Sequence, residues 1–71
     1  MEPIRPGVYR PIKGNSYRVL FTAQHSETRE ELVVYQALYG EQGYWVRPAA
    51  MWLETINRDG YTGPRFTWVE L

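Results

Sequence analysis

The alternation of hydrophobic and polar residues predicts a chain made mainly of short β-strands. The clearest strand covers residues 17–23, where apolar side chains alternate with polar neighbours at a period near two: Tyr17, Val19, Phe21 and Ala23. The preceding Lys13-Gly14-Asn15 has the composition of a turn. A first, shorter strand is predicted to begin over residues 7–10.

The segment from Thr28 to Gly40 fits two secondary structures. Thr28 and Glu31 have the spacing of a capping box, and Gly40 stands where a glycine often ends a helix, so a helix is one interpretation. The β-branched and aromatic cluster Val33-Val34-Tyr35 favours a strand instead. We predict a bent strand from Glu31 to about Leu38, packed on both faces.

The remaining residues predict further short strands separated by turns. Residues 40–43 read as a turn, residues 44–47 as a strand stopped by Pro48, and Pro48 to Met51 as one helical turn. Residues 52–56 are expected to extend again, Asp59-Gly60 to turn, and residues 66–69 to close the sheet. Five or six short strands predict a mainly β, strongly bent, partly open barrel.

The composition bounds how such a fold could be stabilised and where it works. The chain of 71 residues is long enough for one domain, 1–71, and it contains no cysteine and one histidine. Three Trp, six Tyr and two Phe must therefore supply the core. The first residues lack the apolar stretch of a signal peptide, and no apolar run is long enough to span a membrane. We expect a cytoplasmic protein.

Three stretches of sequence resemble an uncharacterised family called domain of unknown function 1653: His25-Ser26-Glu27-Thr28, the run from Glu31 to Glu41, and Trp45-Val46-Arg47-Pro48. The similarity extends over about residues 7–67. It implies an SH3-like small β-barrel, and so favours the strand over the helix for residues 31–38. It implies no established activity. Pro11-Ile12 and Trp52 depart from the family, which often has His-Tyr and phenylalanine at these places.

His25 and Glu27 form the one stretch that could carry proton chemistry. Imidazole titrates near neutral pH, and a carboxylate two residues away could orient it. A second acid–base partner and an oxyanion donor cannot be identified, so a neutral histidine bonded to the main chain is the preferred interpretation. One histidine with scattered carboxylates offers no ligand spacing for a metal, and no metal or other cofactor is expected.

A second candidate site combines aromatic, amide and cationic side chains on strands predicted to be adjacent. It consists of Tyr35, Gln36, Tyr39, Trp45 and Arg47, with the His25 loop beside them. Such a set could stack on a peptide, a base or a partner's side chain. Aromatic residues in a short chain mostly build the core, and Tyr35 and Trp45 are expected there. Arg47 is expected at the surface or in an ion pair with a glutamate.

A third candidate is a basic group near the N-terminus, Arg10, Lys13 and Arg18, with Tyr9 and Tyr17 interleaved. Eight basic and eight acidic residues leave the whole chain with no net charge, so binding of nucleic acid here would be weak and salt-dependent. The leading hypothesis is thus a non-catalytic interaction module that binds a peptide, protein or small ligand. The alternatives are a small enzyme using His25 and Glu27, and a weak single-stranded nucleic-acid binder.

Overall fold

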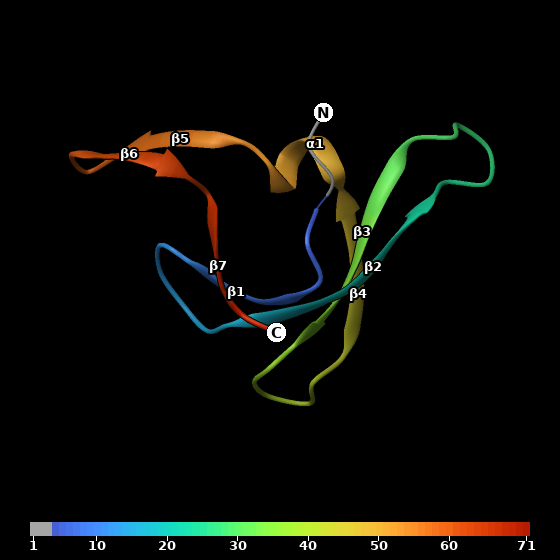
Figure 1. Cartoon of the computed structure of the whole chain (residues 1–71), viewed down its shortest axis with the longest axis horizontal. Helices are drawn as coiled ribbons and strands as arrows, with labels where there is room; N and C mark the ends of the chain where they lie inside the picture. Colours follow the sequence, from blue (N-terminus) through green and yellow to red (C-terminus); the bar gives the residue numbers. More distant parts are fainter. Residues whose placement is uncertain (1–3) are drawn as a thin grey trace.

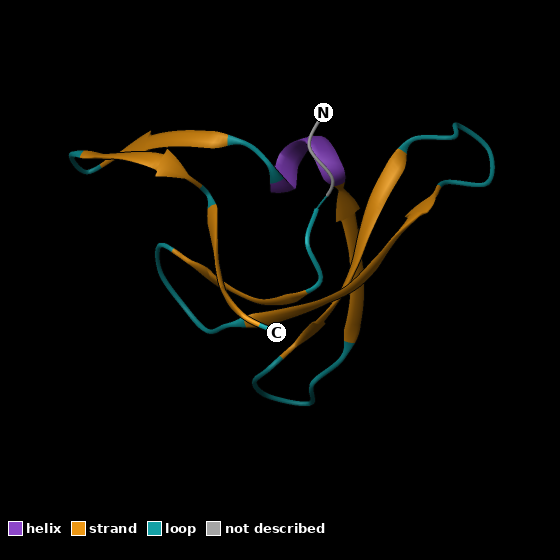
Figure 2. Cartoon of the chain, viewed as in Figure 1, coloured by secondary structure: helices purple, strands orange, loops and turns teal. Residues whose placement is uncertain are grey.

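A bent antiparallel sheet forms most of the structure, a computed structural model that describes residues 4–71 (Figure 1). Within these residues, seven strands and one short helix follow each other: β1 (Gly7–Pro11), β2 (Tyr17–Gln24), β3 (Glu31–Ala37), β4 (Tyr44–Pro48), α1 (Ala49–Trp52), β5 (Thr55–Arg58), β6 (Tyr61–Pro64) and β7 (Phe66–Glu70). Figure 2 shows the helix between the β5–β6 hairpin on the left and the β2–β3 hairpin on the right.

The main sheet has the strand order β4-β3-β2-β1-β7, and β5 pairs with β6 in a separate two-stranded sheet. The first four strands form a meander, and the chain then returns so that β7 lies antiparallel to β1. Register shifts between Val19 and Phe21 and between Val8 and Tyr9 mark irregularities that increase local bending. The sheet curves strongly but does not close into a barrel, in keeping with the predicted partly open architecture.

The contact between β1 and β7 depends on Gly7. Its φ is 132°, and a Cβ at this position would lie 2.5 Å from the carbonyl oxygen of Glu70 and 2.7 Å from Nε1 of Trp68. Only glycine tolerates both this backbone conformation and this close approach. Trp68 Nε1 also donates to the carbonyl oxygen of Pro6 at 3.1 Å, and the guanidinium carbon of Arg5 lies 3.6 Å from its ring centroid. These contacts hold the N-terminal segment against β7.

The competing interpretations of residues 28–40 are resolved in favour of the strand. Residues 31–37 form β3, in which Val33, Tyr35 and Ala37 are buried and the residues between them are partly exposed. Thr28 does not cap a helix, because its Oγ1 accepts a hydrogen bond from the Glu30 N–H within the loop. The capping-box spacing belongs to a turn.

The structure corrects the prediction for residues 52–64. Trp52 was expected in an extended segment, but it ends α1 and is 2% exposed. The helical turn predicted at Pro48–Met51 exists with bounds one residue later. Residues 55–64 form the β5–β6 hairpin rather than one strand and a loop, giving seven strands in place of five or six. The large apolar area of Trp52 explains the difference, since the helix turns this ring into the core.

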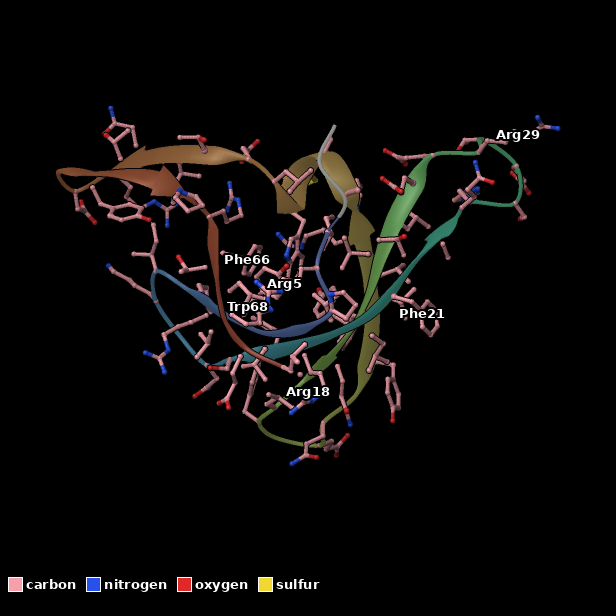
Figure 3. The ribbon with its side chains drawn as sticks, viewed as in Figure 1. Arg5, Arg18, Phe21, Arg29, Phe66 and Trp68 are labelled. Atoms are coloured by element: carbon pink, nitrogen blue, oxygen red, sulfur yellow. The ribbon has the colours of Figure 1, made fainter. Side chains whose placement is uncertain are left out.

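The core lies on the concave face of the sheet. Its buried members are Tyr9, Val19, Val33, Tyr35, Ala49, Trp52 and Phe66, and Ile4, Tyr17 and Trp68 pack against them. In Figure 3 Phe66 and Trp68 lie on this inner side, whereas Arg18 and Phe21 point outward from the convex face. The aromatic core thus covers one face of the sheet. No helix or strand of residues 4–71 packs on the other face.

Candidate functional site

A cavity of about 330 Å³ opens where the β3–β4 hairpin meets the start of β2. We call it the aromatic pocket, because Tyr17, Tyr35, Tyr39 and Trp45 contribute to its lining. Glu41 is the charged residue of the lining, which includes no lysine or arginine. The pocket therefore combines ring surfaces with one negative charge.

The tyrosine rings of the aromatic pocket meet nearly at right angles. The ring of Tyr17 makes an angle of 90° with that of Tyr35 and 73° with that of Tyr39, with centroids 5.3 and 5.7 Å apart. These edge-to-face contacts are the preferred arrangement of aromatic pairs. They fix the walls of the pocket through packing, before any ligand is present.

A hydrogen bond joins two phenols at the pocket, with the Oη atoms of Tyr17 and Tyr39 3.0 Å apart. This hydrogen bond, together with burial and the neighbouring phenols, raises the pKa of Tyr17 from 10.0 to about 12. Tyr17 is therefore a neutral phenol at physiological pH. The pair offers hydroxyl groups, not charge, to whatever enters the pocket.

Trp45 corrects the prediction that it lies in the core. Its side chain is 61% exposed, although it stands opposite Tyr35 in the register and thus on the same face of the sheet. Strand β4 is an edge of the sheet, so no further strand of residues 4–71 lies beside the indole. Tyr35, by contrast, is only 8% exposed, so it lies in the core as predicted. Trp45 and Tyr39, which is 42% exposed, supply the accessible rings of the aromatic pocket.

The loop that closes the aromatic pocket is held by hydrogen bonds. Gln36 Nε2 donates to the carbonyl oxygen of Gln42 at 3.1 Å, and the Gln42 N–H donates to the carbonyl oxygen of Tyr39 at 3.0 Å. Gly40 and Gln42 both have positive φ, of 60° and 55°. Gln36 was predicted to contact ligand; in the structure its amide holds the loop beside the pocket.

Arg47 lies beside a second cavity, of about 170 Å³, that shares Tyr17 with the aromatic pocket. Its guanidinium carbon is 5.6 Å from the centroid of Phe66, a cation–π distance. The glutamate partner considered for Arg47 in the sequence is not found within the described residues, where the ion pairs are Lys13–Asp59 and Arg65–Glu54. Arg47 is half-buried and keeps its charge unpaired there.

His25 lies in the β2–β3 loop, at the end of β3 remote from the aromatic pocket. Its Nδ1 accepts hydrogen bonds from the backbone N–H groups of Glu27 and Thr28, at 3.1 and 3.3 Å. The backbone N–H of His25 donates a hydrogen bond to the carbonyl oxygen of Glu30 at 2.8 Å. The grouping of His25 with the aromatic residues is thus wrong in space. Its imidazole organises a turn, and the geometry gives no support to acid–base chemistry with the Glu27 carboxylate.

The basic N-terminal residues do not gather with the tyrosines between them. Arg18 is opposite Val8 in the register and points from the convex face, while Tyr9 and Tyr17 pair with each other and pack in or against the core (Figure 3). Arg10 is exposed on β1, and Lys13 lies in the β1–β2 loop, its Nζ 3.9 Å from an Asp59 carboxylate oxygen. The stacking platform imagined for nucleic acid is therefore largely buried.

Among the residues of the aromatic pocket that sequence reasoning missed, Tyr17 and Glu41 contribute a phenol and the charge. Tyr17 was assigned to the nucleic-acid face and Glu41 to a turn, but both line the cavity. The signal that could have found Tyr17 is the hairpin register, since Tyr17 lies opposite Ala37 at the end of β3. Across residues 4–71, no cluster of three or more His, Cys, Asp or Glu is placed to hold a metal ion. In the same residues, no helix has the length and apolarity needed to cross a membrane.

The fold and site together define a small, mainly β domain whose bent sheet carries an aromatic pocket at one hairpin end. The chain belongs to the family described as Protein of unknown function (DUF1653), whose model matches residues 7–68. It is similar to a crystal structure of a DUF1653 protein from Bordetella bronchiseptica, with 40% identity and a TM-score of 0.86. The match covers 94% of this chain and 88% of that one. No curated protein matches the chain. The family resemblance inferred from sequence is confirmed.

Proposed function

We propose that this protein is a non-catalytic interaction module that binds an extended segment of a protein partner. The observation that carries this proposal is the exposure of Trp45 and Tyr39 on a formed cavity. Large aromatic side chains at 61% and 42% exposure leave apolar area in contact with water, and binding would bury it. Exposed aromatic rings around a concave site are typical of recognition surfaces.

Strand β4 supports an extended form for the partner segment. It is an edge strand that pairs with β3 on one side, and no second strand pairs with it within residues 4–71. Its free backbone N–H and C=O groups can accept a further strand, a common mode of peptide recognition. Trp45 belongs to this strand, so a segment added at the edge would place a side chain near the aromatic pocket.

The lining of the aromatic pocket favours a basic side chain. Rings present negative faces to cations, and the Glu41 carboxylate adds a negative charge, with no lysine or arginine in the lining to oppose it. We infer that a lysine or arginine of the partner enters between the rings. The neutral phenols of Tyr17 and Tyr39 add hydrogen-bonding capacity without repelling a cation.

Two further features are part of this proposal. The fold is inferred to be an open variant of the SH3-like barrel, supported by the meander of four strands, the helical turn and the return of the last strand to β1. A cytoplasmic location is also proposed, supported by the absence of cysteine from the sequence.

Peptide titration followed by backbone NMR tests the proposal. A pool of extended peptides carrying lysine or arginine should shift the amide signals of residues 39–47 and change the indole signal of Trp45. Trp45→Ala should weaken binding by about tenfold or more, as is usual for a central aromatic anchor.

Phe21→Ala is the matched control for this titration. The exposed fraction of Phe21, 57%, is similar to that of Trp45, but Phe21 points outward from the convex face (Figure 3). It should bind peptides like the wild-type protein. Residues 39–47 that stay inert to every basic and neutral peptide would overturn the proposal.

A further inference from the structure

Four cationic side chains converge on the cavity next to the aromatic pocket, which we call the basic pocket. Each comes from a different part of the fold: Lys13 from the β1–β2 loop, Arg47 from β4, Arg58 from β5, and Arg65 from the residue between β6 and β7. The rest of the lining is apolar apart from Tyr17, and within residues 4–71 it includes no carboxylate. The whole chain has no net charge, so this is a local separation of charge.

Two of these cations have carboxylate partners outside the basic pocket. Arg65 Nε donates to Glu54 Oε1 at 3.2 Å, its Nη2 contacts the same oxygen, and its backbone N–H donates to the Glu54 carbonyl oxygen. Lys13 approaches Asp59 only at 3.9 Å, with both side chains more than three-quarters exposed, and water screens such a pair strongly.

Arg47 and Arg58 have no carboxylate partner within residues 4–71. The basic pocket thus holds about two positive charges that the described residues leave unneutralised. A concave site lined by charge of one sign concentrates its field and draws in counter-ions.

The position of Arg47 makes it a prepared anion ligand. Its guanidinium lies over the ring of Phe66, and Phe66 is itself fixed in the core by its stack on Trp52. The ion pairs described for residues 4–71 do not involve Arg47, so its N–H donors can bind an anion. The side chain is also half-buried, so less rotamer entropy is lost when a ligand binds.

We propose that the basic pocket binds a phosphate monoester. Such a group carries about −1.5 to −2 charge at pH 7, which matches the two unpaired arginines, and its oxygens accept the paired N–H donors of guanidinium. A cavity of about 170 Å³ suits a single small group rather than a large ligand. The phosphate belongs either to a free phosphorylated metabolite or to a phosphorylated side chain. This site adjoins the aromatic pocket, with which it shares Tyr17, but its four cations do not line that pocket.

Titration at low salt tests the basic pocket with defined probes. Inorganic phosphate, ribose 5-phosphate and a phosphoserine tetrapeptide are added to labelled protein, and the Nε–Hε signals of the arginines are followed by NMR. Chloride at equal ionic strength serves as the screening control. We expect saturable shifts at Arg47 and Arg58 with phosphate and not with chloride. The affinities of ribose 5-phosphate and the phosphoserine tetrapeptide are then compared. The probe that binds more tightly identifies the source of the phosphate.

Substitutions separate a built site from diffuse attraction. Arg47→Gln should weaken phosphate binding about tenfold or more, and Arg58→Gln, at an exposed position that the core does not need, by several-fold. Arg18→Gln removes the same charge from the convex face and should change affinity less than about twofold (Figure 3). Trp45→Ala should leave phosphate binding unchanged, so failure of the peptide proposal and failure of this one are distinguishable.

Three results would overturn the inference: shifts that do not saturate, shifts that chloride reproduces, or equal losses in Arg47→Gln and Arg18→Gln. Circular dichroism shows whether each variant is folded. Should Arg47→Gln unfold, Arg58→Gln decides the question, because full phosphate affinity in that variant contradicts a site built from both arginines.

Discussion

The indole of Trp52 stacks on the ring of Phe66, with centroids 4.0 Å apart and ring planes 9° from parallel. Trp52 ends α1 and Phe66 begins β7, so this contact joins the helical turn to the strand that returns to β1. Tyr9 and Tyr35 complete the cluster, with centroids 5.5 and 5.0 Å from the indole. The chain has no disulfides, so this aromatic cluster is the main contact that packs α1 against strands β1, β3 and β7.

Removing the Trp52 ring should therefore destabilise the fold more than any exposed aromatic substitution. Trp52→Ala is expected to lower the free energy of unfolding by about 3–5 kcal/mol, the usual cost of deleting a buried aromatic ring. Trp45→Ala, at 61% exposure, should cost less than about 1 kcal/mol. Urea denaturation of both variants measures the difference. Equal losses would show that the stack contributes nothing special.

Trp52→Phe gives a finer test at the same position. The Trp52 Nε1 atom is buried and has no hydrogen-bond partner among the described residues. An unpartnered buried donor costs about 1–3 kcal/mol, and phenylalanine removes it while losing part of the packed area. We expect the two effects to leave stability within about 1.5 kcal/mol of wild type. A loss of stability as large as that of Trp52→Ala would mean that a single phenyl ring cannot replace the fused indole in the core.

Gly7 predicts a second, independent stability effect. Alanine at this position would need a φ of 132° and would place its Cβ 2.5 Å from a backbone oxygen, so strand β7 would have to move. We expect Gly7→Ala to cost at least about 2 kcal/mol. Gly14→Ala is the control, because its φ is 100° but nothing lies within 4 Å of the added atom. It should cost about 1–2 kcal/mol from backbone strain alone. Thermal unfolding that ranks Gly14→Ala as the more damaging would contradict the close contact.

His25 predicts an effect on the β2–β3 loop. Its Nδ1 accepts two backbone N–H groups, so His25→Ala leaves both donors to water and should lower stability by about 0.5–1.5 kcal/mol. His25→Asn keeps an acceptor of similar reach and should recover part of that loss. Hydrogen exchange at the amides of Glu27 and Thr28 reports the loop directly. Unchanged protection in His25→Ala would show that the imidazole does not hold the turn.

Much of the fold could be predicted because strand alternation depends on the local sequence. The period of two over residues 17–23 and the β-branched cluster of residues 33–35 located β2 and β3, and turn residues located the loops between strands. Residues 52–64 could not be predicted this way. Trp52 belongs to a helix because its ring completes a core assembled from distant strands, and four residues carry no helical periodicity of their own.

The candidate site was less predictable, because alternation shows which face a residue occupies but not whether that face is covered. Tyr35 and Trp45 share a face and stand opposite each other, yet one is buried and the other exposed, because β4 is the edge of the sheet. The basic pocket joins residues 13, 47, 58 and 65, which are far apart in the chain. Only the return of the chain after β4 brings them together.

The phenol pair of the aromatic pocket predicts a pH dependence. The pKa of Tyr17 is about 12 in the folded protein, against an ordinary value of 10.0 for a tyrosine, so folding favours the neutral phenol. The stabilisation is fully present below pH 10 and is lost as the pH rises from 10 through about 12.

Tyr39→Phe removes the hydrogen bond that contributes most to the shift, so the pKa of Tyr17 should fall toward 10. Absorbance of tyrosinate during alkaline titration measures it. Tyr44→Phe, an exposed tyrosine outside the pocket lining, is the control and should leave the late-titrating phenol in place. Burial raises the pKa of Tyr9 as well, so the number of late-titrating phenols is what decides. Fewer such phenols in Tyr44→Phe, or an unchanged number in Tyr39→Phe, would contradict the assignment of the raised pKa to the Tyr17–Tyr39 pair.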